Sequence, residues 1–220
     1  MDVEGTTTAK DFVFQVLFPF STKKMSSFLQ SNYRKDSMSS LLSQLSKEQQ
    51  WAIHSQDELI KKSLEVLLQW IGEDKKHPIL KSIQGMIWEE GYLSGELQSH
   101  VYDDIPGCFQ KWSILEKVLA IYSSGSVLAQ KLLFKYCEKG DLTKYLSAYF
   151  DTSVGHKREA SSYLSIAKSL NVLPSEILFL SDVEEELSAA KSARMGVVLI
   201  NRDHSKSSGE YLEVTDFCKI

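Results

Sequence analysis

Apolar residues recur at helical spacing over the first half of the chain, from residue 11 to about residue 102. We expect a loop over residues 72–78 and a further helical stretch over residues 79–97, which Gly85, Gly91 and Gly95 should interrupt. Stripes of this kind normally pack helices together, so none of them indicates a ligand. Three stripes each lie on one helix face: Met25, Phe28, Leu29 and Tyr33; Met38, Leu41, Leu42 and Leu45; and Ile60, Leu64, Leu67, Leu68 and Ile71.

The pattern changes from Cys108 onward, where short apolar runs alternate with helical stretches. Strands and helices in alternation predict an α/β fold, in which helices cover both faces of a parallel sheet. Ligands of such sheets bind at the carboxyl ends of the strands, which directs attention to Ser123, Ser124 and Asp182. The apolar runs cover residues 118–122, 148–150, 177–180 and 196–200.

Composition places the chain among globular proteins. Its 220 residues are 43% hydrophobic and 25% charged, which excludes wholesale disorder. The formal net charge of -4 argues against attachment to nucleic acid by bulk charge. No apolar run approaches the roughly 20 residues that span a bilayer, and acids at Asp2 and Glu4 do not suit a secretory signal. We therefore expect a cytoplasmic protein with no membrane and no nucleic-acid partner.

Cysteine and histidine patterns argue against several common metal sites. The three cysteines, Cys108, Cys137 and Cys218, lie far apart and form no C-x-x-C pair, so reduced thiols are expected. The five histidines show neither H-x-x-x-H nor H-E-x-x-H spacing. Any metal ion would therefore be held by carboxylates.

Two carboxylates stand at the start of the chain, in the segment Met1-Asp-Val-Glu-Gly-Thr-Thr-Thr8. Asp2 and Glu4 suit a metal-assisted phosphoryl site, because one acid can attack or bind metal while its partner moves a proton. The Gly-Thr turn that follows is expected to expose backbone N–H groups to phosphate oxygens. The alternative is a polar turn with two solvated acids.

Three further polar groups follow predicted strands. Ser123-Ser-Gly-Ser126 precedes a helix, where it forms either an anion site or a helix N-cap. Lys157 is expected to open the next helix, where the helix dipole disfavours a cation and a negative ligand explains it better. Asp182 is either a carboxylate of the site or a helix cap, and Glu186 is expected to share its helix face.

An aspartate, a hydroxyl turn, a lysine and a second aspartate, in this order at strand ends, resemble the four motifs of the haloacid dehalogenase superfamily. Longer segments resemble the acireductone-forming enolase-phosphatases of methionine salvage over nearly the whole chain. Glu4 is typical of this one family, since most phosphatases of the superfamily have aspartate there. The matching segments are residues 2–8, 16–19, 84–88, 91–97, 121–126, 129–133, 155–157 and 178–183.

This resemblance implies a Rossmann-like core of the haloacid dehalogenase type from residues 1–10 and 104–220, with a helical cap over residues 11–103. The implied reaction enolises 2,3-diketo-5-methylthiopentyl-1-phosphate and then dephosphorylates it to acireductone, which is 1,2-dihydroxy-3-keto-5-methylthiopentene. The base for enolisation is expected on the cap, where Gln84, Trp88 and Tyr92 are candidates by position. The family also implies a monomer, in the cytoplasm and in the nucleus.

The resemblance assigns a role to each motif residue. Asp2 would be the nucleophile that forms an aspartyl-phosphate, and Glu4 its acid/base partner. One Mg²⁺ would be held by Asp2, the backbone carbonyl of Glu4, and Asp182. Lys157 would neutralise both Asp2 and the substrate phosphate, which Ser123 and Ser124 would bind through hydroxyl and N–H groups.

The start of the chain departs from the family. There the first aspartate ends a buried central strand, whereas here only Met1 precedes Asp2. Because a strand of such a sheet needs roughly five residues, the first core strand is expected to be truncated, with its two neighbours facing each other across a gap. Either the chain as written is a shortened gene model or isoform, or it lacks a competent sheet.

Three functions remain open at this point. The first is an active enolase-phosphatase, and the second is a phosphatase for another small phosphoester. The third, suggested by the truncated strand, is a non-catalytic isoform or paralogue that acts by binding.

Overall fold

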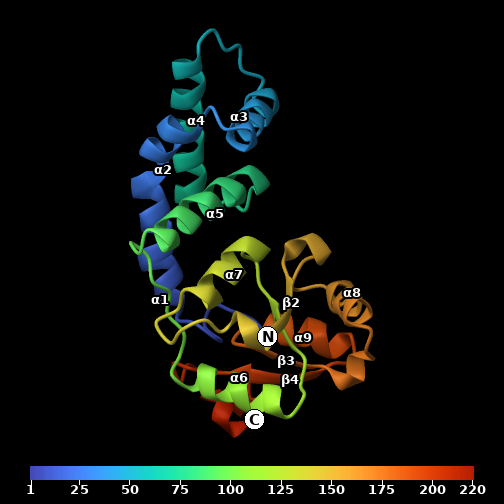
Figure 1. Ribbon diagram of the computed structural model, residues 1–220. Helices are drawn as coiled ribbons and strands as arrows, with labels where there is room; N and C mark the ends of the chain where they lie inside the picture. Colours follow the sequence, from blue (N-terminus) through green and yellow to red (C-terminus); the bar gives the residue numbers. More distant parts are fainter. The chain divides into compact units, whose positions relative to one another are not determined.

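The computed structural model describes all residues from Met1 to Ile220, and the chain forms two compact units (Figure 1). The first unit comprises Met1–Phe12 and Gln98–Ile220, and the second comprises Val13–Leu97. The functional division into a catalytic core, residues 1–10 and 104–220, and a cap, residues 11–103, stays a prediction. No helix is long and apolar enough to cross a membrane.

The second unit is entirely helical. The predicted stripes build its core, except that Leu68 is exposed. Met25, Leu29, Leu45 and Leu67 are fully buried there, so packing accounts for these apolar positions. The unit contains a π-helical turn (Val13–Leu17), α2 (Phe18–Asn32), α3 (Asp36–Glu48), α4 (Gln56–Gly72) and α5 (Pro78–Leu93).

Helix α5 is continuous, so the predicted breaks at Gly85 and Gly91 are wrong. Gly91 packs so closely that a Cβ there would lie 2.6 Å from the ring of Phe20. Glycine is therefore present because the neighbouring helix approaches closely, and the packing outweighs its low helix propensity. Gly95, with φ +76°, follows the end of the helix.

The first unit contains the predicted α/β pattern (Figure 1). Each predicted run forms a strand within about two residues of its expected bounds, while the two-residue strand β5 was too short to leave a pattern. The strands are β1 (Leu119–Tyr122), β2 (Leu146–Phe150), β3 (Leu178–Ser181), β4 (Gly196–Ile200) and β5 (Glu213–Val214). The main helices are α6 (Asp104–Ile114), α7 (Val127–Lys135), α8 (Ala160–Leu170) and α9 (Glu184–Ser192).

The sheet is divided in two, as the truncated first strand predicts. One parallel sheet has the order β1-β2 and the other β3-β4-β5. Met1 and Asp2 connect them by backbone hydrogen bonds: the N–H of Tyr122 donates to the Met1 carbonyl, and the N–H of Asp2 donates to the Leu180 carbonyl, each at 2.9 Å. These two residues therefore lie between β1 and β3 and bond to both of them.

A cavity of about 610 Å³ lies between the two sheets, and Met1 is part of its lining. It is lined by the strand segments 117–122 and 176–180, together with side chains of the helices α6 and α8. Parallel strands buried between two helical layers are apolar on both faces. The lining is largely of this kind, with Trp112 from α6, Leu115 directly after it, and Tyr163, Ile166 and Leu170 from α8, although charged residues such as Lys111 and Glu176 also contribute.

Candidate active site

Asp2 lies at the carboxyl ends of β1 and β3, where the two sheets come together. Its backbone N–H is bonded to Leu180 of β3, and the preceding residue is bonded to Tyr122 of β1. The Asp2 side chain is only 6% exposed. A buried carboxylate needs a positive partner, so the interpretation of Asp2 as a solvated acid is wrong.

The chain turns back directly after Asp2. The N–H groups of Thr6, Thr7 and Thr8 all donate to the Val3 carbonyl, at 3.2, 2.8 and 3.0 Å, and the N–H of Gly5 donates to Thr8. The predicted exposure of these N–H groups to phosphate is therefore wrong, because the turn uses them internally.

Gly5 is required in this turn for two reasons. Its φ of +77° lies in the left-handed region that glycine adopts without strain. A Cβ at this position would also overlap the carboxylate of Asp182 and the side chain of Lys10.

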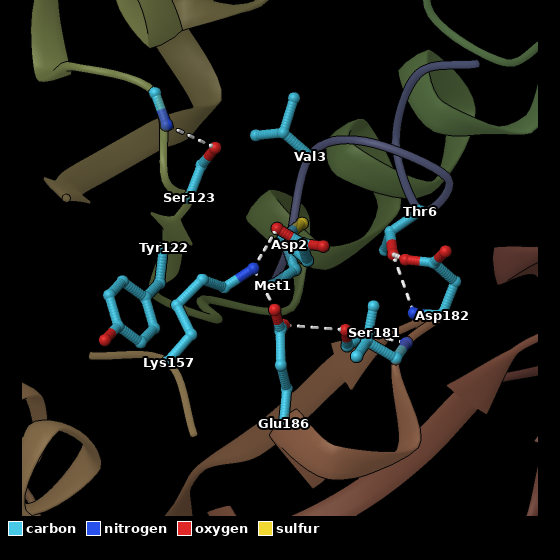
Figure 2. A network of polar contacts seen from close by, with 12 residues as sticks. Met1, Asp2, Val3, Thr6, Tyr122, Ser123, Lys157, Ser181, Asp182 and Glu186 are labelled. Atoms are coloured by element: carbon cyan, nitrogen blue, oxygen red, sulfur yellow. Dashed lines mark hydrogen bonds and ion pairs between the residues drawn. The ribbon is translucent and has the colours of Figure 1, made fainter. Parts of the chain in front are cut away.

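Lys157 lies between two carboxylates, as Figure 2 shows. Its Nζ is 2.5 Å from Oδ1 of Asp2 and 2.7 Å from Oε2 of Glu186. Burial by itself would lower the pKa of Lys157, but the two carboxylates outweigh burial and raise it. The lysine is therefore cationic at neutral pH and holds its charge next to the predicted nucleophile.

The loop that carries Lys157 is fixed by tyrosines. Helix α8 begins only at Ala160, so the prediction that Lys157 opens the helix is wrong. The hydroxyl of Tyr163 donates to the Lys157 carbonyl at 2.7 Å, and that of Tyr122 donates to the Gly155 carbonyl at 3.0 Å. Hydrogen bonds from the sheet and from α8, rather than a helix terminus, position the lysine.

Glu186 is a member of the site that the motif analysis left without a role. Its Oε2, which forms the ion pair with Lys157, also accepts a hydrogen bond from the Ser181 hydroxyl at 2.9 Å (Figure 2). Burial, followed by the negative charge of Asp2, raises the pKa of Glu186 to about 7. The signals in the sequence that it belongs here were its spacing of four residues from Asp182 and its agreement with the family at this position.

Asp182 has partners different from those of Glu186, although the two were expected to share a helix face. Its backbone N–H donates to Thr6 Oγ1 at 3.0 Å, and the Thr6 hydroxyl donates to its Oδ1 at 3.2 Å. Its Oδ2 forms an ion pair with Lys10. It precedes α9, whose N-terminus has no side-chain cap, so the alternative of Asp182 as a helix cap is wrong.

The serines after β1 divide into two groups. Ser126 caps α7 by accepting from the N–H of Ala129 at 3.3 Å, so the capping interpretation holds for this residue. Ser123 is buried at the end of β1 and accepts from the N–H of Gly125 at 3.1 Å. Phosphate binding by Ser123 and Ser124 stays a prediction.

The three candidates for substrate enolisation lie on α5 in the helical unit, and all are buried. The indole N–H of Trp88 donates to the Leu17 carbonyl at 2.8 Å, and the Gln84 amide donates to Ser21 Oγ at 3.3 Å. Both contacts are internal to the unit and explain the burial of these polar groups. The catalytic role of Gln84, Trp88 and Tyr92 stays a prediction.

Comparison with known proteins identifies the family. The enolase-phosphatase E1 of Cronobacter sakazakii is 41% identical over 219 residues, which cover 100% of this chain and 94% of the relative. The enolase-phosphatase E1 of Drosophila persimilis is 40% identical over 235 residues and is covered to 92%. The chain belongs to the enolase-phosphatase E1 family. No family model matches it.

Solved structures agree with the fold of an enolase-phosphatase E1. The UTR4 protein of Saccharomyces cerevisiae superposes with a TM-score of 0.83 at 34% identity, covering 100% of this chain and 97% of that one. A phosphatase of the haloacid dehalogenase type from Thermococcus onnurineus has a TM-score of 0.62 at 20% identity and covers 99% and 93%. The predicted fold class, α/β of the haloacid dehalogenase type, is confirmed.

The donor set of this enolase-phosphatase E1 site fits Mg²⁺. Burial and the charge of Asp2 raise the pKa of Asp182, so a cation near these two carboxylates relieves their repulsion. No cluster of three or more His, Cys, Asp or Glu side chains is present. Mg²⁺ is commonly held by one or two carboxylates, while water and substrate phosphate complete its shell.

Lys10 was not predicted, yet its ammonium contacts the carboxylate expected to bind metal. Its side chain is 53% exposed, so the ion pair is worth only about 0.2–1 kcal/mol. We expect Lys10→Met to strengthen Mg²⁺ binding by about 1.4- to fivefold, which is the same energy expressed as an affinity ratio. Calorimetric titration of the purified chain with Mg²⁺ measures this without an activity assay.

The matched control is Lys10→Arg, which retains a cation next to Asp182 and should bind Mg²⁺ with nearly native affinity. Weaker Mg²⁺ binding by Lys10→Met than by the native chain would contradict competition between the ammonium and the metal.

Proposed function

We propose that this chain converts 2,3-diketo-5-methylthiopentyl-1-phosphate to acireductone and phosphate, in the salvage of methionine. The observation that carries the proposal is the buried cluster of Asp2, Lys157 and Glu186 at the strand ends of an enolase-phosphatase E1 family member. Family membership makes the chain a phosphoric monoester hydrolase. The cluster places a carboxylate nucleophile beside a fixed cation, which suits phosphoryl transfer.

In the proposed mechanism, Asp2 attacks the phosphorus atom of the enolised substrate. A bond forms between a carboxylate oxygen and phosphorus while the bond from phosphorus to the enolic oxygen breaks, and Glu4 protonates the departing oxygen. Water then attacks the aspartyl-phosphate as Glu4 takes its proton, which releases phosphate and restores Asp2. Throughout, Lys157 offsets the repulsion between the anionic nucleophile and the phosphate.

One Mg²⁺ would be held by Asp2, Asp182 and the backbone carbonyl of Glu4, where it would further neutralise the transferring phosphoryl group. The substrate phosphate would contact Ser123 and Ser124. We also propose that the chain acts as a monomer on this small phosphoester in the cytoplasm and the nucleus, without nucleic-acid or membrane partners.

The test is release of phosphate from the diketo phosphate and from a panel of other small phosphoesters. We expect turnover with Mg²⁺ that ceases on exhaustive chelation with EDTA and returns when Mg²⁺ is restored, with ultraviolet absorbance reporting the conjugated product. Faster turnover of another phosphoester would contradict the substrate assignment. Full turnover after chelation would contradict the role of Mg²⁺.

Non-catalytic binding remains a second candidate function because the sheet is divided in two. Asp2 is joined to β3 by one backbone hydrogen bond, and Met1 joins it to β1. If these hydrogen bonds are too few to orient the Asp2 carboxylate, the chain could still bind a partner through its surface but would not catalyse phosphoryl transfer.

The Glu4→Gln variant tests the acid/base role. An amide can neither protonate the enolic oxygen nor activate water, while the backbone carbonyl of residue 4 remains available to Mg²⁺. We expect turnover to fall by about a hundredfold or more, Mg²⁺ affinity to change little, and aspartyl-phosphate to accumulate. Rapid acid quenching followed by mass spectrometry detects the intermediate.

Asp2→Asn is the control for that measurement, because it cannot form the intermediate. If Glu4→Gln loses Mg²⁺ binding and traps no aspartyl-phosphate, the Glu4 side chain is a metal ligand and its acid/base role is wrong.

A further inference from the structure

Arg202 is a buried cation that has no part in the proposed mechanism. It lies just beyond the carboxyl end of β4, and its side chain is only 7% exposed. A charge removed from water needs partners for its hydrogen-bond donors. One partner is Asp104, the first residue of α6, whose two carboxylate oxygens each lie 2.9 Å from Nη1 of Arg202. This ion pair uses only one end of the guanidinium group.

The other end of the guanidinium group binds the backbone of the turn that follows Asp2. Nε and Nη2 of Arg202 both donate to the Thr6 carbonyl, at 3.2 and 2.9 Å. The rings of Tyr102 and Phe217 lie against the same group, with centroids 4.2 and 5.1 Å from its Cζ. Arg202 is therefore held in one orientation, in which it fixes the position of the Thr6 carbonyl.

Thr6 connects Arg202 to Asp182. The Thr6 hydroxyl donates to Oδ1 of Asp182 at 3.2 Å, and the Asp182 N–H donates to Thr6 Oγ1 at 3.0 Å (Figure 2). Thr6 is fully buried, and a β-branched side chain has few rotamers, so the backbone position decides where its hydroxyl lies. A displacement of the Thr6 carbonyl would therefore disturb both hydrogen bonds to Asp182.

Arginine suits this position better than lysine. Its planar guanidinium group presents donors in two directions at once, whereas the ammonium of lysine is a single point charge. Lysine could meet either the Asp104 carboxylate or the Thr6 carbonyl, but it could not hold both in the geometry observed for Arg202.

We propose that Arg202 is a positioning residue for the metal site, which fixes Thr6 and through it holds the Asp182 carboxylate in place for Mg²⁺. This role rests on the proposed function, because Asp182 is a metal ligand only there. Loss of a group that hydrogen-bonds a metal ligand typically weakens metal binding by about 10- to 100-fold. Arg202 acts one contact further away, so the effect is expected at the lower end of that range.

The test is calorimetric titration of the 220-residue chain and of Arg202→Met with Mg²⁺. Methionine keeps part of the buried side chain but has no donors. We expect Mg²⁺ to bind about tenfold more weakly and the amide of Asp182 to exchange its hydrogen faster. Arg202→Lys retains one donor for the Thr6 carbonyl and should fall between the native chain and Arg202→Met. Neither measurement requires turnover.

Asp104→Asn is the matched control, because it removes the charge of the ion pair and leaves the hydrogen bonds from Arg202 to Thr6. Both Asp104→Asn and Arg202→Met should lower the melting temperature, but only Arg202→Met should weaken Mg²⁺ binding. Equal weakening in the two variants would overturn the proposal, since stability of the ion pair would then explain the effect.

Thr6→Val tests the route from Arg202 to Asp182. It removes the hydroxyl and keeps the carbonyl that Arg202 binds, so Mg²⁺ affinity should fall here too. The double variant of Arg202→Met and Thr6→Val should lose less affinity than the two single losses combined, because both act through the same contact. Independent losses would overturn the proposal. Native affinity in Thr6→Val would overturn it as well, even if Arg202→Met fails to fold.

Failure of the proposed catalysis is distinguishable from failure of this role. If the native chain binds Mg²⁺ and the variants weaken binding as expected, but no phosphate is released, the positioning role is supported and the proposed reaction is contradicted. Native Mg²⁺ affinity in Arg202→Met, or no Mg²⁺ binding by the native chain, would overturn the positioning role.

Discussion

Asp2→Asn is expected to abolish phosphate release while leaving binding of a substrate analogue measurable. Asparagine has nearly the same volume but is a poor nucleophile, and loss of a covalent nucleophile costs on the order of 10⁴-fold or more in turnover. The Asp2 side chain is 6% exposed and 2.5 Å from Lys157, so the substitution also removes one of two counter-charges from a buried cation. Single-turnover phosphate release and analogue titration measure the two effects separately.

Glu186→Gln is the matched control, because it removes the other counter-charge of Lys157 and leaves the nucleophile in place. Because the pKa of Glu186 is about 7 and its carboxyl is therefore only partly ionised at neutral pH, Glu186→Gln should lose no more stability in thermal unfolding than Asp2→Asn, and only Asp2→Asn should lose turnover by four orders of magnitude. A near-native rate for Asp2→Asn would show that another group attacks phosphorus. Equal losses of turnover would show that the charge balance around Lys157 matters more than the identity of the nucleophile.

The core strands were predictable because each forms a short apolar run that can be recognised in the local sequence. Residues 196–200, for example, form an unbroken apolar run, as expected of a strand buried on both faces, and the run coincides with β4. The strand β5 has only two residues, so its sequence has no periodicity to detect. The division of the sheet was also predictable, because Asp2 with one preceding residue is too short to form a strand. The sheet is divided at this position.

The members of the candidate site were more predictable than their contacts. Asp2, Lys157 and Asp182 follow strand ends, and the parallel sheet gathers strand ends at one edge. No local pattern shows that Glu186 turns toward Lys157 or that Lys10 pairs with Asp182, because these pairs join residues 29 and 172 positions apart in the sequence. Similarly, the predicted helix break at Gly91 was wrong because this glycine packs closely against Phe20. That packing is a tertiary contact, which the local sequence does not show.

Joining a short apolar segment to the chain before Met1 is expected to raise both the melting temperature and the turnover. Four apolar residues would occupy the cavity between β1 and β3, and burying them is worth roughly 6–12 kcal/mol before the entropy of ordering them is subtracted. The extension also converts the buried Met1 amine, whose pKa burial lowers to about 5, into an ordinary peptide N–H. A net gain of even 2 kcal/mol corresponds to roughly 4–8 °C for a chain of this size.

Turnover should rise because Asp2 would then end a strand that is bonded along both edges. In the chain as it stands, the aspartate is aimed by Met1 and by single backbone bonds to Ala120, Tyr122 and Leu180. The control is an extension of equal length with aspartate at two inward positions, which adds residues without filling an apolar cavity. Calorimetry and phosphate release would be measured for all three chains at equal concentration. If the unextended chain melts cooperatively at the same temperature and turns over as fast as the apolar extension, two bridging residues suffice to aim the nucleophile, and the divided sheet is not a functional defect.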